Sequence, residues 1–149
     1  MTQSPSLKTF LWFNDGLQDA LNFYRATFGE QLRVNEEHLS NPQLFTADFA
    51  IYGHEFIGMN MPGGDTFNNS ISLSIQVDGQ DETDRLWDAI TADGEPGRCG
   101  WCKDKWGVSW QITPFQMHDF LGDPDGVKAQ KNWGILREMN KIQLSDFVQ

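Results

Sequence analysis

The sequence predicts an α+β fold in which a strand–helix–strands unit occurs twice. The first observation is an internal repeat: Asp15-Gly16 precedes Phe23-Tyr24 and Asp78-Gly79 precedes Leu86-Trp87, both at an offset of 63 residues. The second is the alternation of apolar and polar residues over 70–77, which is typical of a half-buried strand. The third is the helical spacing of apolar residues after each Asp-Gly pair.

The first half of the chain is expected to form one such unit. Residues 7–13 are apolar on both faces and predict a buried strand. Asp15 is the expected N-cap of a helix that ends at Gly29. A tight turn is expected at Gly53-His54. The helix should bury Leu17, Ala20, Leu21, Tyr24 and Phe28, and three more strands are expected at 31–38, 44–52 and 55–60.

The second half repeats this order and adds a helical tail. Ile71, Leu73, Ile75 and Val77 should share one face of a strand over 70–77, before a helix that buries Thr83, Leu86, Trp87 and Ile90. Residues 99–114 predict a β-hairpin, with Val108, Trp110 and Ile112 on its apolar face and Lys103, Asp104 and Lys105 at its turn. Pro114 can open a short helix, and Asp123 with Pro124 can start another that carries the stripe Ala129, Trp133, Leu136 and Met139.

The hairpin also carries a family resemblance. Its segment Gly-Trp-Cys-Lys-Asp-Lys-Trp-Gly-Val-Ser-Trp-Gln-Ile-Thr-Pro (100–114) resembles the signature of PhnB-like proteins. These form a branch of the glyoxalase, bleomycin-resistance and extradiol-dioxygenase superfamily, the vicinal oxygen chelate proteins. Three further segments match in the same order: Leu-Trp-Phe-Asn-Asp-Gly (11–16) leading into Phe23-Tyr24, Thr66-Phe67-Asn68, and Asp123-Pro124-Asp125 leading into Lys128-Ala129-Gln130.

The resemblance implies two βαβββ modules that form a curved mixed sheet, with helices on the outer face and a pocket on the inner face. We expect a single glyoxalase-like domain over 1–149, with module one at about 7–61, module two at about 70–114 and a helical tail at 115–149. The superfamily usually pairs modules between subunits, so the resemblance also implies a homodimer.

Composition narrows the class of protein. A chain of 149 residues that is 39% hydrophobic, with six Trp, should be globular. The net charge of −10 and the lack of a Lys/Arg cluster argue against nucleic acid and anionic membranes as partners. Residues 1–6 lack the features of a signal peptide, and no apolar run is long enough to cross a bilayer. We therefore expect a soluble cytoplasmic protein.

Cys99 and Cys102 form a CxxC motif that has two interpretations. A redox pair of thioredoxin type would place the first cysteine at a helix N-terminus after a strand. Here the pair lies beside a strand that leads into a hairpin. Two reduced cysteines are the favoured interpretation in a cytoplasmic protein.

The resemblance also indicates where a metal would be held, at positions on the first and last strands of each module. By register these positions fall on Thr9, Asn60, Ser72 and Gln111. All four side chains are neutral, whereas transition metals prefer imidazole, thiolate or carboxylate. We therefore predict no metal and no other cofactor.

Three histidines could still serve a general-base or metal role. His38 follows two glutamates, His54 precedes Glu55 at a turn, and His118 precedes Asp119. A solvated pair of a histidine and a carboxylate on the surface gives the same sequence pattern, and we favour this interpretation for all three. His54 is expected to lie nearest to the pocket rim. The alternative function, a metal-dependent lyase, isomerase or dioxygenase with a divalent metal, would need His54, Glu55 or His38 to turn inward.

The sequence therefore favours a metal-free protein that binds a small organic molecule. The name demethylubiquinone methyltransferase has attached to relatives, but Phe-Asn-Asp-Gly-Leu (13–17) is not the Gly-rich loop of a nucleotide-type methyltransferase. Trp12 and Trp101 could line the cavity, although packing in the core is favoured for both. The polar lining is expected to consist of Thr9, Asn60, Ser72, Ser74, Ser109 and Gln111.

Overall fold

A computed structural model describes residues 3–149, so the first two residues of the expected domain and of its N-terminal segment lie outside the described part. The chain divides into two compact units, one ending at Thr66 and the other beginning at Phe67. Each unit contains one of the two expected modules. Within the described residues, no helix has both the length and the apolar character needed to cross a membrane.

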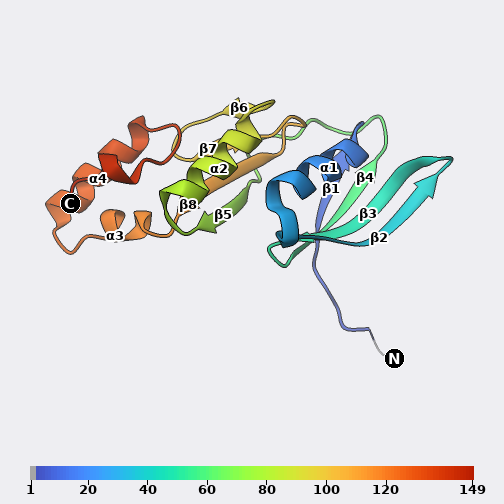
Figure 1. The fold of residues 1–149 in the computed structure, drawn as a ribbon, viewed down its shortest axis with the longest axis horizontal. Helices are drawn as coiled ribbons and strands as arrows, with labels where there is room; N and C mark the ends of the chain where they lie inside the picture. The colour runs from blue at the N-terminus through green and yellow to red at the C-terminus, as the bar shows by residue number, and fades with distance from the viewer. Residues whose placement is uncertain (1–2) are drawn as a thin grey trace. The chain divides into compact units, whose positions relative to one another are not determined.

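The first unit is a βαβββ module. Its sheet has the order β1-β4-β3-β2, in which β1 and β4 run parallel and the other neighbours run antiparallel. Figure 1 shows α1 beside this sheet. Its elements are β1 (Thr9–Phe13), α1 (Leu17–Phe28), a short 3₁₀ turn (Gly29–Gln31), β2 (Leu32–Ser40), β3 (Gln43–Ile51) and β4 (His54–Asn60).

An aromatic cluster joins α1 to the sheet. Tyr24 of α1 stacks on Phe49 of β3 at 6.4 Å between ring centroids, and Phe49 stacks on Phe56 of β4 at 5.1 Å. Gly58 lies beside them, and a Cβ at this position would come within 2.6 Å of Leu17 Cδ1. The glycine therefore lets the helix approach the sheet closely. All five helix residues predicted to be buried are buried.

Two local details of this unit correct the sequence interpretation. The N-cap of α1 is Gly16, in the left-handed region at φ 86°, and Asp15 only accepts a hydrogen bond from the Gly16 amide. The turn between β3 and β4 consists of Tyr52 and Gly53 rather than Gly53-His54. Both turn residues have positive φ, as the right-handed twist of a two-residue hairpin requires.

The second unit repeats the same connectivity. Its sheet has the order β5-β8-β7-β6, with β5 and β8 parallel and the other neighbours antiparallel. The chain as a whole is therefore α+β and built of two βαβββ modules, as predicted, and each module has a mixed four-stranded sheet of its own. The elements are β5 (Leu73–Val77), α2 (Gly79–Thr91), β6 (Glu95–Pro96), β7 (Trp101–Lys103), β8 (Ser109–Pro114), α3 (Met117–Leu121), α4 (Gly126–Glu138) and a 3₁₀ turn (Leu144–Asp146).

The hairpin between β7 and β8 is organised by one buried carboxylate. Asp104 is only 3% exposed. Its Oδ1 accepts hydrogen bonds from the amides of Trp106 and Val108, both at 3.0 Å, and its Oδ2 accepts one from Trp110 Nε1 at 3.0 Å. Buried carboxylates need such donors because an unsatisfied charge is costly to bury. The loop and the core Trp110 are therefore fixed by the same side chain.

Two boundaries in this unit also differ from the predictions. β5 begins at Leu73 rather than at residue 70, and Ile71 is 74% exposed instead of lying on the apolar face. The helix α4 is capped by Asp125, whose Oδ1 accepts hydrogen bonds from the amides of Val127 and Lys128. Asp123, the predicted cap, accepts a hydrogen bond from the Asp125 amide and so shapes the turn before the cap.

The tail folds back on its own unit around a separate apolar cluster. This cluster contains Met117, Leu136, Met139, Ile142 and Phe147. Two backbone hydrogen bonds, from Cys99 N to Met139 O and from Gly100 N to Asn140 O, join the tail to the segment before β7. The side chain of Gln80 in α2 also binds the tail. Its Nε2 donates to Ile142 O at 2.8 Å, and its Oε1 accepts from the Leu144 amide at 2.8 Å. In Figure 1 the helices α3 and α4 lie side by side.

Candidate functional site

The second sheet has one face covered by α2 and one open face that is mostly polar. Trp110 and Ile112 of β8 are buried on the helix side. The intervening residues of β8 face the other way, because successive side chains of a strand alternate. In the paired register Gln111 lies beside Ser74 of β5 and Trp101 of β7, so these three side chains share the open face.

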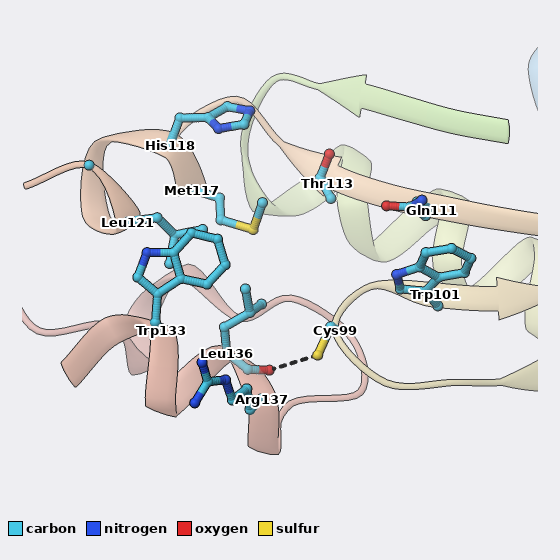
Figure 2. A pocket seen from close by; sticks show the side chains of 11 residues that line it. Cys99, Trp101, Gln111, Thr113, Met117, His118, Leu121, Trp133, Leu136 and Arg137 are labelled. Atoms are coloured by element: carbon cyan, nitrogen blue, oxygen red, sulfur yellow. Dashed lines mark hydrogen bonds between the residues drawn. The ribbon is translucent and has the colours of Figure 1, made fainter. Parts of the chain in front are cut away.

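A cavity of about 570 Å³ lies between this open face and the tail. Figure 2 shows strand residues on one side of it and residues of α3 and α4 on the other, with Trp101 and Trp133 at opposite ends. Its volume is in the range of small-molecule sites in proteins. The lining consists of Cys99, Trp101, Gln111, Thr113, Met117, His118, Leu121, Gly122, Trp133, Leu136 and Arg137.

The polar floor of the cavity, which is formed by Gln111 and Thr113 of β8, is neutral, and some of its hydrogen-bonding atoms already have partners within the protein. Gln111 Nε2 donates to Ser72 Oγ at 2.8 Å, and this bond fixes the orientation of the amide. Its Oε1 has no hydrogen-bond partner among residues 3–149 and remains available as an acceptor. Thr113 Oγ1 donates to Ile75 O at 3.4 Å. The floor can therefore orient a ligand through the side-chain carbonyl of Gln111, which is an uncharged acceptor.

Five of the residues predicted for the site belong to this unit. Trp101 and Gln111 line the cavity, and Ser72 acts on it through Gln111. Ser74 lies on the open face but does not line the cavity. Ser109 Oγ donates to Asn69 Oδ1 at 2.9 Å, so its hydroxyl serves the loop before β5.

The three predicted residues of the first unit are divided between the two faces of its own sheet. Thr9 Oγ1 bonds His54 Nε2 at 2.9 Å, and Asn60 Oδ1 accepts from the Leu17 amide at 3.4 Å, so both lie on the face that α1 covers. The expected inner-face placement is off by one residue, because a one-residue slip moves a side chain to the other face. Trp12 lies on the opposite face of the first sheet from Thr9 and Phe13, as expected for the inner face, and its Nε1 donates to Met61 O at 2.6 Å.

All three histidines are exposed, as expected, but the one that lies at the cavity is not the one expected there. His54, expected nearest the pocket, packs against Phe56 at 4.8 Å between rings in the first unit. His38 Nε2 lies 3.3 Å from Glu36 Oε1 on an exposed strand. His118, the only histidine of the second unit, lines the cavity. In sequence it carried no signal beyond its neighbour Asp119.

Most of the lining that the sequence did not predict comes from the tail. Met117, Leu121, Trp133, Leu136 and Arg137 approach the cavity from α3 and α4. The sequence signal for these residues was the apolar stripe that contains Trp133 and Leu136. The stripe indicates that the helix packs on an apolar surface, but it does not identify that surface. In the structure Leu136 is buried, whereas Trp133 is 47% exposed and forms one end of the cavity.

The cysteines remain two free thiols. Cys99 lines the cavity and its Sγ donates to Leu136 O at 3.4 Å. Burial raises the pKa of the Cys102 thiol to about 12, and the nearby charge of Asp104 acts in the same direction. Redox-active pairs depend on a thiolate of lowered pKa, so this environment favours a structural role for Cys102.

This pKa shift predicts a loss of stability in alkali. The unfolded thiol titrates near 9.0 and the folded one near 12, so the stabilisation is complete below pH 9 and is lost as the pH rises towards 12. In this window the free energy of unfolding should fall by about 1.4 kcal/mol per pH unit because of Cys102. Urea denaturation from pH 8 to 11 should give a flatter pH dependence for Cys102→Ala. Equal slopes for the two proteins would contradict the prediction.

The donor atoms of the cavity do not fit a tightly held transition metal. Within residues 3–149, no three His, Cys, Asp or Glu side chains converge to hold an ion. The floor offers an amide and a hydroxyl, which are weak ligands for such metals, and His118 supplies one imidazole. One imidazole and the thiol of Cys99, with neutral oxygen donors, fall short of the three strong ligands that a catalytic site of this kind uses.

Comparison with known proteins identifies the family. The sequence model of the family described as 3-demethylubiquinone-9 3-methyltransferase matches residues 5–113. The chain therefore belongs to this PhnB-like family. No curated protein matches the chain.

One solved structure supports the same assignment, and two others share the fold. A Bacillus cereus protein described as a putative 3-demethylubiquinone-9 3-methyltransferase, PhnB protein, is 26% identical over 74% of this chain and 99% of its own, with a TM-score of 0.67. A Pseudomonas aeruginosa protein is 18% identical over 74% and 98%, with a TM-score of 0.61. The fosfomycin resistance protein FosX from Listeria monocytogenes, solved with Mn(II) and sulfate, is 15% identical over 81% and 98%, with a TM-score of 0.56. The last two likenesses show the fold alone.

Proposed function

For this member of the PhnB-like family, we propose a metal-independent binding protein whose site is the cavity between the second sheet and the tail. Its ligand is a small organic molecule with a flat, apolar part. The observation that carries the proposal is the combination of Trp101, Trp133 and the free acceptor of Gln111 around a cavity of about 570 Å³.

The lining supports this ligand class chemically. Met117, Leu121 and Leu136 provide apolar walls, which favour transfer of an apolar group out of water. The two indoles offer flat surfaces on which a ring can stack. Gln111 Oε1 can accept one hydrogen bond and so select the orientation of the bound molecule. Such a balance of apolar walls and few polar groups is typical of ligand pockets.

The family match covers this site only in part, and the tail completes it. Seven of the eleven lining residues follow residue 113, where the match ends. The floor thus comes from the family's sheet, whereas the opposite wall comes from α3 and α4. We infer that the choice of ligand is a property of the tail. The methyltransferase named in the family description is not our proposal, because neither module has the doubly wound parallel sheet of nucleotide-type methyltransferases.

Truncation of Trp133 tests the site. With the neutral probe 2-naphthamide, Trp133→Ala should weaken binding about tenfold, since it removes a stacking surface worth about 1 kcal/mol or more. Stability should change little, because Trp133 is 47% exposed. Binding is measured through the indole Nε1–H signals of Trp101 and Trp133 in ¹⁵N-edited NMR spectra, assigned with the two Trp→Phe variants.

Val127→Ala provides the matched control. Val127 lies on the same helix, is 78% exposed and does not line the cavity. It should bind 2-naphthamide as the wild type does. The proposal is overturned if 2-naphthamide leaves the signals of Trp101 and Trp133 unshifted, or if both alanine variants bind it equally.

A further inference from the structure

We propose that the molecule bound in this cavity is a singly charged organic anion, an aromatic carboxylate whose acidic group is held by Arg137. This inference rests on the proposed function and specifies its ligand class.

The charge of the lining is the first argument. The chain carries a net charge of −10, with 21 Asp and Glu residues, yet no carboxylate lines the cavity. Arg137 is the one Lys or Arg side chain among the lining residues. The cavity is therefore a local site of positive charge in an acidic protein, where an anion meets the least repulsion.

The lack of a partner for Arg137 is the second argument. Two other basic side chains of the second unit are held in ion pairs: Arg85 with Glu82 at 2.6 Å and Lys141 with Asp84 at 3.0 Å. Across residues 3–149, Arg137 makes no ion pair and its guanidinium donates no hydrogen bond. Its donors are therefore available to a ligand without first breaking a bond within the protein.

The geometry of α4 is the third argument. Trp133 and Arg137 are four residues apart, so they lie on one face of the helix, with Leu136 on the same side (Figure 2). A ring that packs on Trp133 would place an attached carboxylate about one helical turn away, at the guanidinium. The planar guanidinium fork matches the two oxygens of a carboxylate. One such cation balances one negative charge, which favours a monoanion over a phosphate dianion.

The test compares two probes of the same shape and different charge, 2-naphthoate and 2-naphthamide. Wild-type protein should bind the carboxylate about tenfold more tightly than the amide. This is the lower end of the contribution expected from a hydrogen bond to a charged group, because Arg137 is exposed to solvent. Arg137→Gln should abolish this preference, so that the variant binds 2-naphthoate and 2-naphthamide with equal affinity. Lys131→Gln removes an exposed cation from the same helix outside the cavity, and should keep the tenfold preference.

The outcomes separate this inference from the function on which it rests. Equal affinity of wild type for the two probes would overturn the anion assignment and leave the binding site intact. A preference that survives in Arg137→Gln, or is lost equally in Lys131→Gln, would overturn the role of Arg137. If neither probe shifts the indole signals of Trp101 and Trp133, the proposed function itself is wrong.

Discussion

Asp104→Ala is expected to lower the free energy of unfolding by about 3 to 4 kcal/mol, well above the usual effect of a single substitution. The variant leaves the amides of Trp106 and Val108 and the indole N–H of Trp110 without their acceptor. Each unsatisfied buried donor costs about 1 to 3 kcal/mol, and part of this cost is recovered where water reaches the loop. Urea denaturation gives the change directly.

Asp125→Ala is the matched control for this substitution. Asp125 also accepts hydrogen bonds from two backbone amides, but at an exposed helix N-terminus. Its loss should cost about 1 kcal/mol, the usual value for an N-cap. Asp104→Asn should fall between the two, since an amide can still accept from the backbone but offers no second acceptor to Trp110. If Asp104→Ala costs no more than Asp125→Ala, the buried network does not hold the hairpin.

The architecture could be predicted because its signals are local and repeated. Alternation in β8 separates Trp110 and Ile112 from Gln111, and the structure buries the first two on the helix side. The spacing of Leu17, Leu21 and Tyr24 likewise predicts the buried face of α1. The PhnB-like resemblance correctly implied two βαβββ modules. The homodimer that it also implied stays a prediction.

The site could be predicted only in part because it depends on register and on tertiary packing. Residues 7–13 are apolar on both faces, so no alternation shows which residues of β1 face α1, and Thr9 lies on the face that α1 covers instead of the expected inner face. Arg137 carried no signal at all, because an exposed cation near a helix end is common in sequence. Only the path of the tail shows that α4 returns to the second sheet and brings Arg137 to the cavity that Gln111 and Trp101 also line.

Asn132→Ala is the second substitution with a large expected effect, and it links stability to binding. Asn132 is fully buried in α4. Its Nδ2 donates to Phe120 O of α3 and to Val148 O, both at 3.2 Å, and its Oδ1 accepts from the Val148 amide at 2.8 Å. One side chain therefore holds α3, α4 and the end of the chain together. Its truncation should cost about 3 kcal/mol, because three partly buried backbone groups lose their partners.

The same substitution should weaken binding of 2-naphthamide, although Asn132 does not line the cavity. Met117 and Leu121 of α3 form one part of the wall and Trp133 of α4 another, so their spacing depends on the bond from Asn132 to Phe120 O. Affinity is measured at a temperature where the variant is still folded, so that global unfolding does not contribute.

Asn22→Ala serves as the control, since Asn22 is exposed on α1 in the other unit and its Oδ1 accepts only from Gln18 Nε2. Alanine at an exposed helix position should leave stability equal or slightly higher, and binding unchanged. A folded Asn132→Ala protein that binds 2-naphthamide as tightly as wild type would show that the tail wall keeps its shape without this network. The spacing of α3 and α4 would then have to come from the apolar cluster of Met117, Leu136 and Phe147. In that case Leu136→Ala would be the substitution expected to change this spacing and so to weaken binding of 2-naphthamide.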